Sequence, residues 1–348
     1  MGLFILRRLG VMLLTALCLT FVVFFLTNLY PNLEKLAKSE GNNRMTDAEV
    51  SSFLDKRGYL DPLVVKYGRW LGVVPGWTYT DDTGKTIGRC IDPGMAPEDA
   101  PRFCGVIQGD WGSSTVFKEP VFDVTMKRLG LTGWLMLFVM LVMVPGALII
   151  GVLAGMREGS QTDRTLSTAS IITTATPEYV SGVIFIAIFA SSAVGLKWFK
   201  GTSASAMDGI TFENFTLPVL TIALYGMGYI ARMTRASMTE VMTAQYIRTA
   251  RLKGVSFTNI VLKHALRNAL IAPFTVIMLQ IPWLLNGVVI VETLFNYKGF
   301  GWTLVQAAGN NDIELLLGVS VVSVIVVLLT QLISDIGYVY LNPRIRIS

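Results

Sequence analysis

The stretch GWLMLFVMLVMVPGALIIGVLA, Gly133–Ala154, contains no charged residue. A helix needs about 20 mainly apolar residues to cross the hydrocarbon of a bilayer. Five further stretches are comparable: Leu9–Leu29, Leu166–Val194, Phe215–Ala231, Ala269–Val291 and Ile313–Tyr340. The composition agrees, because 52% of the 348 residues are hydrophobic and only 15% are charged, too few for a soluble protein of this size. The sequence therefore predicts an all-α polytopic membrane protein with six transmembrane helices.

The first stretch follows Arg7 and Arg8, as a signal peptide would. Its apolar run is too long for a signal peptide, and no small-x-small cleavage site follows it. We therefore expect residues 1–29 to be retained as an anchor helix. Prolines interrupt several stretches, and in a membrane bundle neighbouring helices can satisfy the backbone groups that they free. These are Pro145, Pro177, Pro218, Pro273 and Pro282.

Lys and Arg in short loops indicate orientation, because cytoplasmic loops are enriched in them. The loop after the fourth stretch contains one acid, Glu240, and the cations Arg232, Arg235, Arg248, Arg251, Lys253, Lys263 and Arg267. The C-terminal tail adds Arg344 and Arg346. The loop after the fifth stretch instead has the acids Glu292, Asp312 and Glu314 against Lys298. Both termini and the basic loop are therefore expected in the cytoplasm, and residues 30–127 outside.

The external segment has the signals of a small folded α/β cap between the first and second spans. Thr46 and Glu49 have the spacing of a capping box, and Gly58 is expected to end the helix that they begin. Asp61 is expected to cap a second helix at Asp61-Pro62. The sequence TYTDDTGKTI, residues 78–87, is typical of a hairpin.

Cys90 and Cys104 both fall in this external segment. Two cysteines close in sequence in an oxidising compartment favour a disulfide. Metal binding is the weaker alternative, because His264, the single histidine of the chain, is expected on the other side of the membrane. Cys18 lies in the first stretch, where a small core hydrophobe is the expected role.

Catalysis has little support in the sequence. Thr83-Gly84-Lys85-Thr86 resembles the end of a phosphate-binding loop, but Tyr79 stands where that loop requires its first Gly. No serine, histidine and acid converge on one face. The chain is therefore expected to have no catalytic residue, no nucleotide site, no metal site and no cofactor of its own.

The segment YIRTARLKGVSFTNIVLKHALRNA, Tyr246–Ala269, is basic and lacks acids. We expect a helix from Thr239 to Lys253, a corner at Gly254, and a second helix capped by Ser256. This basic segment has three possible roles: a loop that contacts lipid phosphates, a nucleic-acid site, or a docking element for a soluble partner. Nucleic acid is disfavoured, because no aromatic interleaving or known module accompanies the charge.

The order of these residues resembles the cytoplasmic coupling loop of ABC-importer permeases, most closely in the dipeptide, oligopeptide and nickel subfamily. Of the general pattern Glu-Ala-Ala-x3-Gly, only Ala250 and Gly254 agree, whereas the subfamily's own variant matches nearly throughout. Gln245 stands where the subfamily usually has an acid. Further matching motifs are Ile5–Leu9, Tyr59–Leu63, Gly109–Ser113, Glu292–Phe295, Gly299–Gly301 and Asn342–Arg346. The departure is an insert near residues 75–107, which holds the hairpin and both external cysteines.

The resemblance implies a type I ABC importer arrangement in the bacterial inner membrane, with residues 30–127 in the periplasm and a permease core at 128–348. The implied partners are a second homologous permease, one or two cytoplasmic ATPases that bind ATP and magnesium, a periplasmic or lipid-anchored solute-binding protein, membrane lipids and a peptide-like substrate. Its coupling loop would be residues 236–268. The implied coupling residues are Tyr246, Arg248, Thr249, Ala250, Arg251, Lys253 and Gly254.

Glu178 follows Pro177 inside the third stretch. An acid at membrane depth is expected to face either a substrate path or a neighbouring helix with which it pairs, and the sequence favours neither. A secondary carrier driven by an ion gradient is the main alternative function, but it would favour buried charge pairs and repeated halves. Only Glu178 and no clear repeat are found. The insert is expected to bind the receptor or to cover the outer mouth.

Overall fold

The computed structural model describes residues 2–81, 84–91, 94–192 and 196–341. Four features named above lie outside this range: Thr83, Val194 at the end of the third stretch, the Asn342–Arg346 motif, and the tail cations. The chain forms two compact units. The first is Met1–Arg128 with Thr303–Val326, and the second is Leu129–Trp302 with Val327–Ser348.

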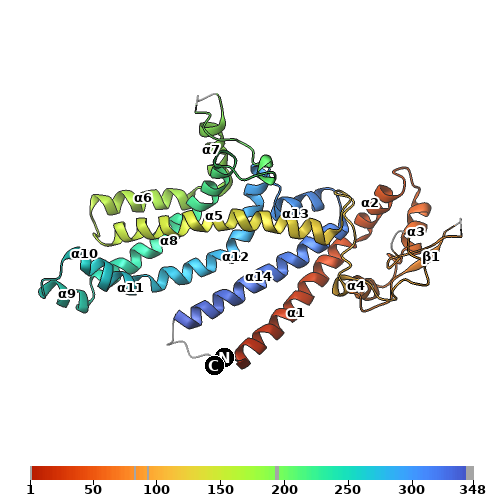
Figure 1. The fold of residues 1–348 in the computed structure, drawn as a ribbon, viewed down its shortest axis with the longest axis horizontal. Helices are drawn as coiled ribbons and strands as arrows, with labels where there is room; N and C mark the ends of the chain where they lie inside the picture. The colour runs from red at the N-terminus through yellow and green to blue at the C-terminus, as the bar shows by residue number, and fades with distance from the viewer. Residues whose placement is uncertain (1, 82–83, 92–93, 193–195, 342–348) are drawn as a thin grey trace. The chain divides into compact units, whose positions relative to one another are not determined.

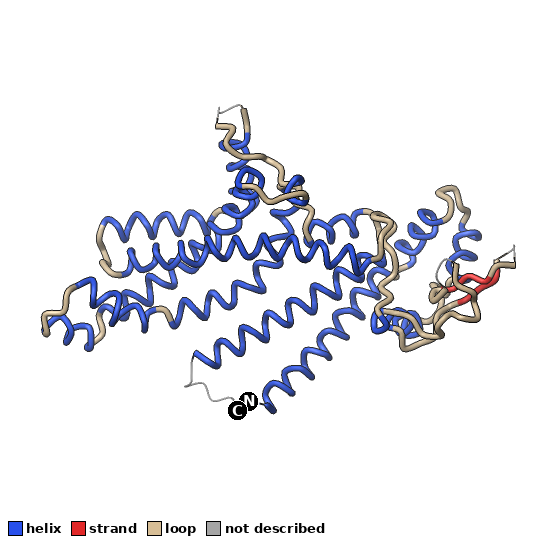
Figure 2. Tube along the Cα trace, viewed as in Figure 1, coloured by secondary structure: helices blue, strands red, loops and turns tan. Residues whose placement is uncertain are grey.

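The first unit contains four helices that precede the long α5 (Figure 1). They are α1 (Gly2–Thr27), α2 (Tyr30–Glu40), α3 (Asp47–Lys56) and α4 (Leu63–Leu71). The antiparallel hairpin of β1 (Thr78–Thr80) and β2 (Thr86–Gly88) confirms the hairpin that the sequence predicts, and Figure 2 shows these strands in red. A 3-10 turn, η1, covers Val106–Gln108. The helices α5 (Val121–Gly155), α13 (Phe300–Gly309) and α14 (Ile313–Leu341) have residues in both units.

The remaining elements belong to the second unit. They are α6 (Gln161–Ala175), α7 (Glu178–Phe185), η2 (Ile186–Ala190), η3 (Ala204–Met207), α8 (Phe212–Met242), α9 (Gln245–Leu252), α10 (Phe257–Asn259), η4 (Ile260–Ala265), α11 (Leu266–Ala269) and α12 (Ile271–Leu294). In Figure 1, α6 and α8 lie side by side. At Gly228 of α8, a Cβ atom would lie 2.6 Å from the carbonyl oxygen of Ser170 on α6. This close approach explains the glycine.

The predicted spans are present, two of them bent. Within the described residues, four helices are long and apolar enough to cross a membrane: Leu6–Thr27, Val121–Gly155, Phe212–Met242 and Ile313–Gly337. Two pairs reach this length only together: Gln161–Ala175 with Glu178–Ala190, bent by 101°, and Phe257–Ala269 with Ile271–Leu285, bent by 50°. Counting each pair as one span gives the expected six. The sharper bend begins at Thr176, which is extended because it precedes Pro177.

The local signals of the cap have mixed outcomes. The capping box is confirmed, since Thr46 and Glu49 exchange both hydrogen bonds, and Gly58 has φ 66° just after the helix. The expected cap by Asp61 is wrong. The helix begins at Leu63 without a side-chain cap, and the Asp61 carboxylate instead accepts from Arg69 Nη1 at 2.6 Å. A hydrogen bond from the charged Arg69 guanidinium is stronger than one from a neutral backbone N–H group, so the carboxylate pairs with Arg69.

The cap is closed by packing and by a covalent bond. Its core contains the buried side chains Phe24, Leu33, Leu36, Val50, Leu54 and Trp70, with Ile313 and Leu317 of α14. Cys90 and Cys104 form the expected disulfide, with 5.5 Å between their Cα atoms. The disulfide therefore cross-links two positions within the insert, which is not an open loop.

Candidate functional site

The basic segment forms a small folded tip. α9 presents one face to a cluster of buried apolar residues, which includes Ile247 (0% exposed) and Ala250 (7% exposed) of α9 itself. The other buried members are Met238, Met242, Ile260, Val261, Ala265 and Ala269. The continuous helix expected from Thr239 to Lys253 is interrupted, because α8 ends at Met242 and α9 begins at Gln245. This break lets α9 turn back, so that Ile247 and Ala250 pack against Met238 and Met242 of α8.

The corner after α9 is held by backbone hydrogen bonds. The Gly254 N–H donates to the Arg251 carbonyl at 3.0 Å, and the Val255 N–H donates to the Ala250 carbonyl at 3.2 Å. Gly254 has φ 75°, a left-handed conformation that L side chains rarely adopt. The next helix begins at Phe257 with Ser256 at its N-cap position, but the Ser256 side chain makes no capping bond.

The outer face of α9 is polar and cationic, with one apolar exception. Six of the seven coupling residues expected from the sequence are exposed: Tyr246, Arg248, Thr249, Arg251, Lys253 and Gly254. The seventh, Ala250, lies on the packed face. The structure adds Leu252, whose 81% exposure is the largest of any large hydrophobic side chain described. The sequence carried a signal for it, since Leu252 is five positions, or about 140° of helical turn, from the buried Ile247.

The cations of this face are not neutralised within the tip. Arg248, Arg251 and Lys253 form no ion pair with any residue that the structure describes. Tyr246 is anchored, because its hydroxyl accepts a hydrogen bond from Asn268 Nδ2 at 2.9 Å. A fixed aromatic ring, free cations and an exposed leucine together are suited to docking against an acidic surface that has an apolar socket.

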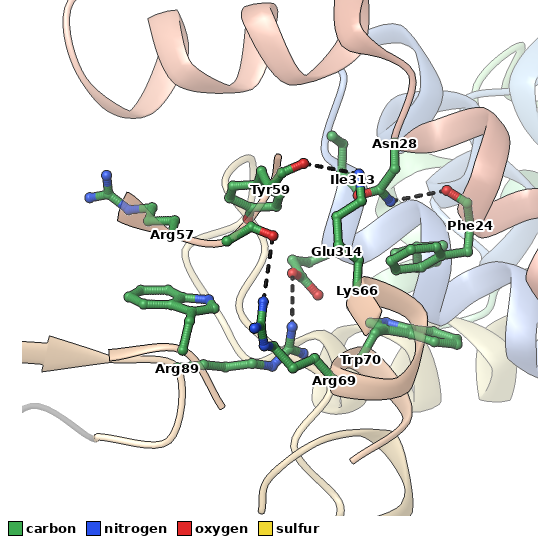
Figure 3. A pocket seen from close by; sticks show the side chains of 13 residues that line it. Phe24, Asn28, Arg57, Tyr59, Lys66, Arg69, Trp70, Arg89, Ile313 and Glu314 are labelled. Carbon is green, nitrogen blue, oxygen red and sulfur yellow. Dashed lines mark hydrogen bonds and ion pairs between the residues drawn. The ribbon is translucent and has the colours of Figure 1, made fainter. Parts of the chain in front are cut away.

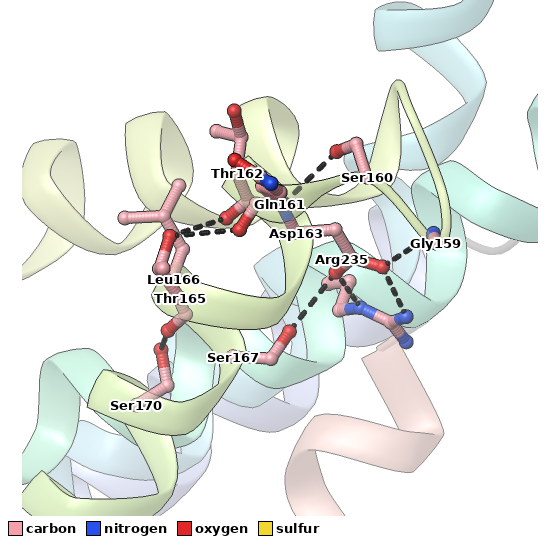
Figure 4. Close-up of polar contacts among 10 residues, drawn as sticks. All are labelled: Gly159, Ser160, Gln161, Thr162, Asp163, Thr165, Leu166, Ser167, Ser170 and Arg235. Atoms are coloured by element: carbon pink, nitrogen blue, oxygen red, sulfur yellow. Dashed lines mark hydrogen bonds and ion pairs between the residues drawn. The ribbon is translucent and has the colours of Figure 1, made fainter.

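A half-buried ion pair joins α8, from which the tip extends, to α6 (Figure 4). Arg235 of α8 donates through Nε and Nη2 to the two carboxylate oxygens of Asp163, at 2.5 and 2.8 Å. Asp163 is 2% exposed and also accepts from the Gly159 N–H and the Ser167 hydroxyl. The sequence predicts a loop at Arg235, but this residue lies within α8, which continues to Met242. The pair therefore joins α6 and α8 rigidly.

The sequence places Glu292 and Asp312 in the loop after the fifth span, but the structure shows that both are buried. Glu292 lies within α12 and is 0% exposed, and Asp312 is 0% exposed as well. Glu292 accepts hydrogen bonds from the Thr132 hydroxyl and from the Trp302 N–H, the latter at 2.9 Å. Asp312 accepts from the Ser114 hydroxyl at 2.6 Å. These carboxylates satisfy buried donors and so are not solvated loop charges.

Glu178 is the first residue of α7, directly after the bend at Pro177. Its side chain is half-buried and forms no hydrogen bond or ion pair with a described residue. Its Oε1 atom lies 3.8 Å from the position that a Cβ atom at Gly287 of α12 would occupy. The alternative in which Glu178 pairs with a neighbouring helix therefore finds no partner within the described part of this chain.

A polar cavity in the cap is too small for a solute. It has a volume of about 30 Å³ and is lined by residues such as Arg69, Arg89 and Glu314, shown in Figure 3. A water needs about 10–15 Å³ of such space, so the cavity has room for about two or three waters. Burial lowers the pKa of Lys66 at its rim, where Nζ donates to the Tyr59 carbonyl at 3.0 Å. The residues that line this small cavity stabilise the cap and do not form a site for a solute.

Comparison with known proteins places the chain in a class. The family model described as "Binding-protein-dependent transport system inner membrane component" matches residues 147–347. The chain belongs to this family of transport permeases.

Individual relatives resemble it over most of its length. The oligopeptide transport system permease protein AppB of Bacillus subtilis (strain 168) is 31% identical over 87% of this chain and 87% of its own. The probable peptide ABC transporter permease protein y4tP of Sinorhizobium fredii (strain NBRC 101917 / NGR234) is 30% identical over 99% and 100%. The glutathione transport system permease protein GsiC of Salmonella choleraesuis (strain SC-B67) is 34% identical over 69% and 76%.

Proposed function

We propose that this chain is one of two permease subunits of an ATP-driven importer for peptides or similar small solutes, and that its tip receives the force of ATP hydrolysis. In this proposal the termini and the tip lie in the cytoplasm, and residues 30–127 form a periplasmic cap. A solute-binding protein delivers the substrate from outside. One or two ATPase subunits bind ATP and magnesium, and this chain contributes half of the translocation path. Relatives named for oligopeptide and glutathione transport support the solute class.

The observation that carries the proposal is the outer face of α9. An 81% exposed leucine lies among cations that form no ion pair with a described residue, a combination suited to an interface with an acidic partner. Burying Leu252 against a partner would contribute about 2 kcal/mol. The cations would pair with acids on the partner and orient it. A soluble ATPase is the partner that this chemistry and the family both favour.

The coupling mechanism follows from how the tip is attached. A partner that moves the outer face of α9 moves its buried face as well, because close-packed groups transmit displacement. That face rests on Met238 and Met242 of α8. The Asp163–Arg235 pair then passes the movement to α6. Rigid-body rocking of these helices would alternate access to the path.

The insert at residues 75–107 is proposed to serve the external side. Its disulfide and the hairpin give it a fixed shape. A fixed shape lowers the entropy lost when a receptor binds. We therefore assign to the insert the docking of the solute-binding protein.

The test introduces one negative charge at each of two exposed positions of the tip. Leu252→Asp changes the outer face of α9, and Thr258→Asp changes α10, outside the proposed coupling residues. We expect Leu252→Asp to lose co-purification of the ATPase subunits and solute-stimulated ATP hydrolysis, and Thr258→Asp to keep both. If the two variants behave alike, α9 is not the docking surface.

A further inference from the structure

A cavity of about 570 Å³ opens between α6, α8 and α12, and none of its lining residues belongs to the apolar cluster of the tip. Its wall combines apolar, aromatic and polar groups: Ile171, Tyr225, Tyr229, Arg232, Gln280 and Trp283. A volume of this size lies in the range typical of sites for small molecules, about 300–1,000 Å³. All of its lining residues belong to the second unit.

Gln280 is the first sign that this cavity takes a ligand. The residue is 8% exposed, so more than nine-tenths of it is buried, yet it lines the cavity. Its side-chain amide forms no hydrogen bond with any residue that the structure describes. An amide carries two donors and one acceptor, and at Gln280 these atoms are accessible from the cavity. A polar ligand in the cavity would satisfy them.

Arg232 supplies the charge. It lies on the same helix as Arg235, one turn away, but the two differ in their partners. Arg235 is paired with Asp163, whereas Arg232 forms no ion pair with a described residue and faces the cavity. A planar guanidinium binds a carboxylate through two parallel hydrogen bonds. The group that suits this position is therefore a carboxylate.

Two aromatic residues form another part of the wall, and the acid Glu178, which does not line the cavity, lies beyond them. Tyr225 and Trp283 stack with ring centroids 5.0 Å apart and 15° between their planes. A Cβ atom at Gly287 would lie 3.6 Å from the Trp283 ring and 3.8 Å from Glu178 Oε1. The unpaired carboxylate of Glu178 therefore lies just beyond the tryptophan. An ammonium group could meet both the ring face and this carboxylate.

Two positions on α12 give a length scale: Gln280 lines the cavity, and Gly287 lies next to the Glu178 Oε1 atom. Gln280 and Gly287 are seven residues apart on α12, which is about 10 Å at 1.5 Å per residue. Three extended residues span a similar length, about 10 Å. Along α12, the cavity-lining Gln280 and the position next to Glu178 are thus separated by about the length of a short peptide.

We propose that this cavity is a solute-binding subsite that holds the carboxylate of a short zwitterionic peptide at Arg232 and Gln280, with its ammonium end toward Glu178. The assignment rests on the proposed import function and adds the substrate's charge pattern to it. Tyr225 and Trp283 form the apolar wall against which the peptide backbone lies.

The probe is trialanine, compared with trialanine amide, which lacks the carboxylate. Binding is measured to the assembled transporter in lipid nanodiscs without the solute-binding protein. We expect the wild type to bind trialanine at least about tenfold more tightly than the amide, the effect of one charge-assisted hydrogen bond. Arg232→Gln should abolish this preference by weakening trialanine alone. Glu178→Gln should weaken both peptides, since both keep the ammonium group.

Two further variants keep the test decisive if Arg232→Gln fails to assemble. Gln280→Leu should weaken trialanine binding without removing charge. Arg164→Gln removes an exposed cation of α6 that does not line the cavity, and should leave both affinities unchanged. Equal binding of the two probes, binding of neither, or equal effects of Arg232→Gln and Arg164→Gln would each overturn the proposal. The same holds if a helix of the partner permease fills the cavity, which would protect Leu279→Cys from thiol reagents even without peptide.

Failure of this subsite is distinguishable from failure of the coupling proposal. Leu252→Asp is expected to lose ATPase coupling while trialanine discrimination persists, because the tip and the cavity share no lining residue. Loss of discrimination in Arg232→Gln with normal ATPase association would be the converse result.

Discussion

The corner at Gly254 allows the coupling proposal to be tested by backbone strain alone. A Cβ atom at Gly254 would meet no atom within 4 Å, so a small substitution creates no clash inside the chain. What changes is the conformational cost of φ 75°. For an L-residue other than Asn or Asp, the left-handed region costs about 1–2 kcal/mol. That corresponds to a loss of about 5–30-fold in the population of the native corner.

A graded series separates strain from side-chain size. Gly254→Asn is expected to retain coupling, since Asn tolerates this region, and Gly254→Ala is expected to reduce it. Gly254→Val should be worse than Ala, because β-branched residues are genuine outliers at positive φ. Gly254→Leu adds bulk to the outer face and should impair both transport and coupled ATP hydrolysis while receptor docking stays intact. Gly209→Ala is the matched control, with open space around it and no positive φ.

The assay is solute-stimulated ATP hydrolysis by the reconstituted complex, relative to its unstimulated rate. The expected order of coupling is Gly, Asn, Ala, Val, with the ATPase subunits still present in each preparation. Normal transport by well-folded Gly254→Leu and Gly254→Val complexes would refute the reasoning, because the corner would then not need its left-handed geometry.

Three further variants test the buried polar contacts. Asp163→Asn should destabilise the complex by about 3 kcal/mol, since it leaves Arg235 partly buried without its charge partner; thermal inactivation measures this. Glu292→Gln should cost about 1–3 kcal/mol, because one amide oxygen must serve two buried donors, and a lower midpoint of thermal unfolding is expected. Removing the disulfide with Cys90→Ser should cost the cap about 3 kcal/mol, given its sequence separation of 14, and should speed proteolysis within residues 75–107. Unchanged stability or cleavage would contradict each account.

Much of the architecture could be predicted because its signals are local. The apolar stretches, the Thr46 capping box, the hairpin at 78–87 and the corner at Gly254 each depend on neighbouring residues and on intrinsic backbone preferences. The disulfide was predictable from compartment and spacing. Asp61 shows the limit of such reasoning. Its carboxylate is able to cap the next helix or to pair with a cation, and in the fold it pairs with Arg69.

The candidate sites were only partly predictable. The sequence indicated which residues of the tip carry charge, and helical spacing separates Leu252 from Ile247, but only the fold shows that Ile247 and Ala250 are on the packed face. Arg232 and Arg235 look alike in the sequence. Only the fold pairs one with Asp163, 72 positions away, and leaves the other facing a cavity.

Apolar length and backbone preferences act over short distances, so the class of the protein, its helical spans, the place of its basic segment and several of its turns can be predicted from the sequence. Which polar groups find partners depends on the fold. Pairing depends on side chains brought together from distant parts of the chain, as Glu292 with Thr132 and Asp163 with Arg235 are. Among the described residues, the cations of α9 form no ion pair and the Gln280 amide forms no hydrogen bond, so these groups are available to a partner or a solute.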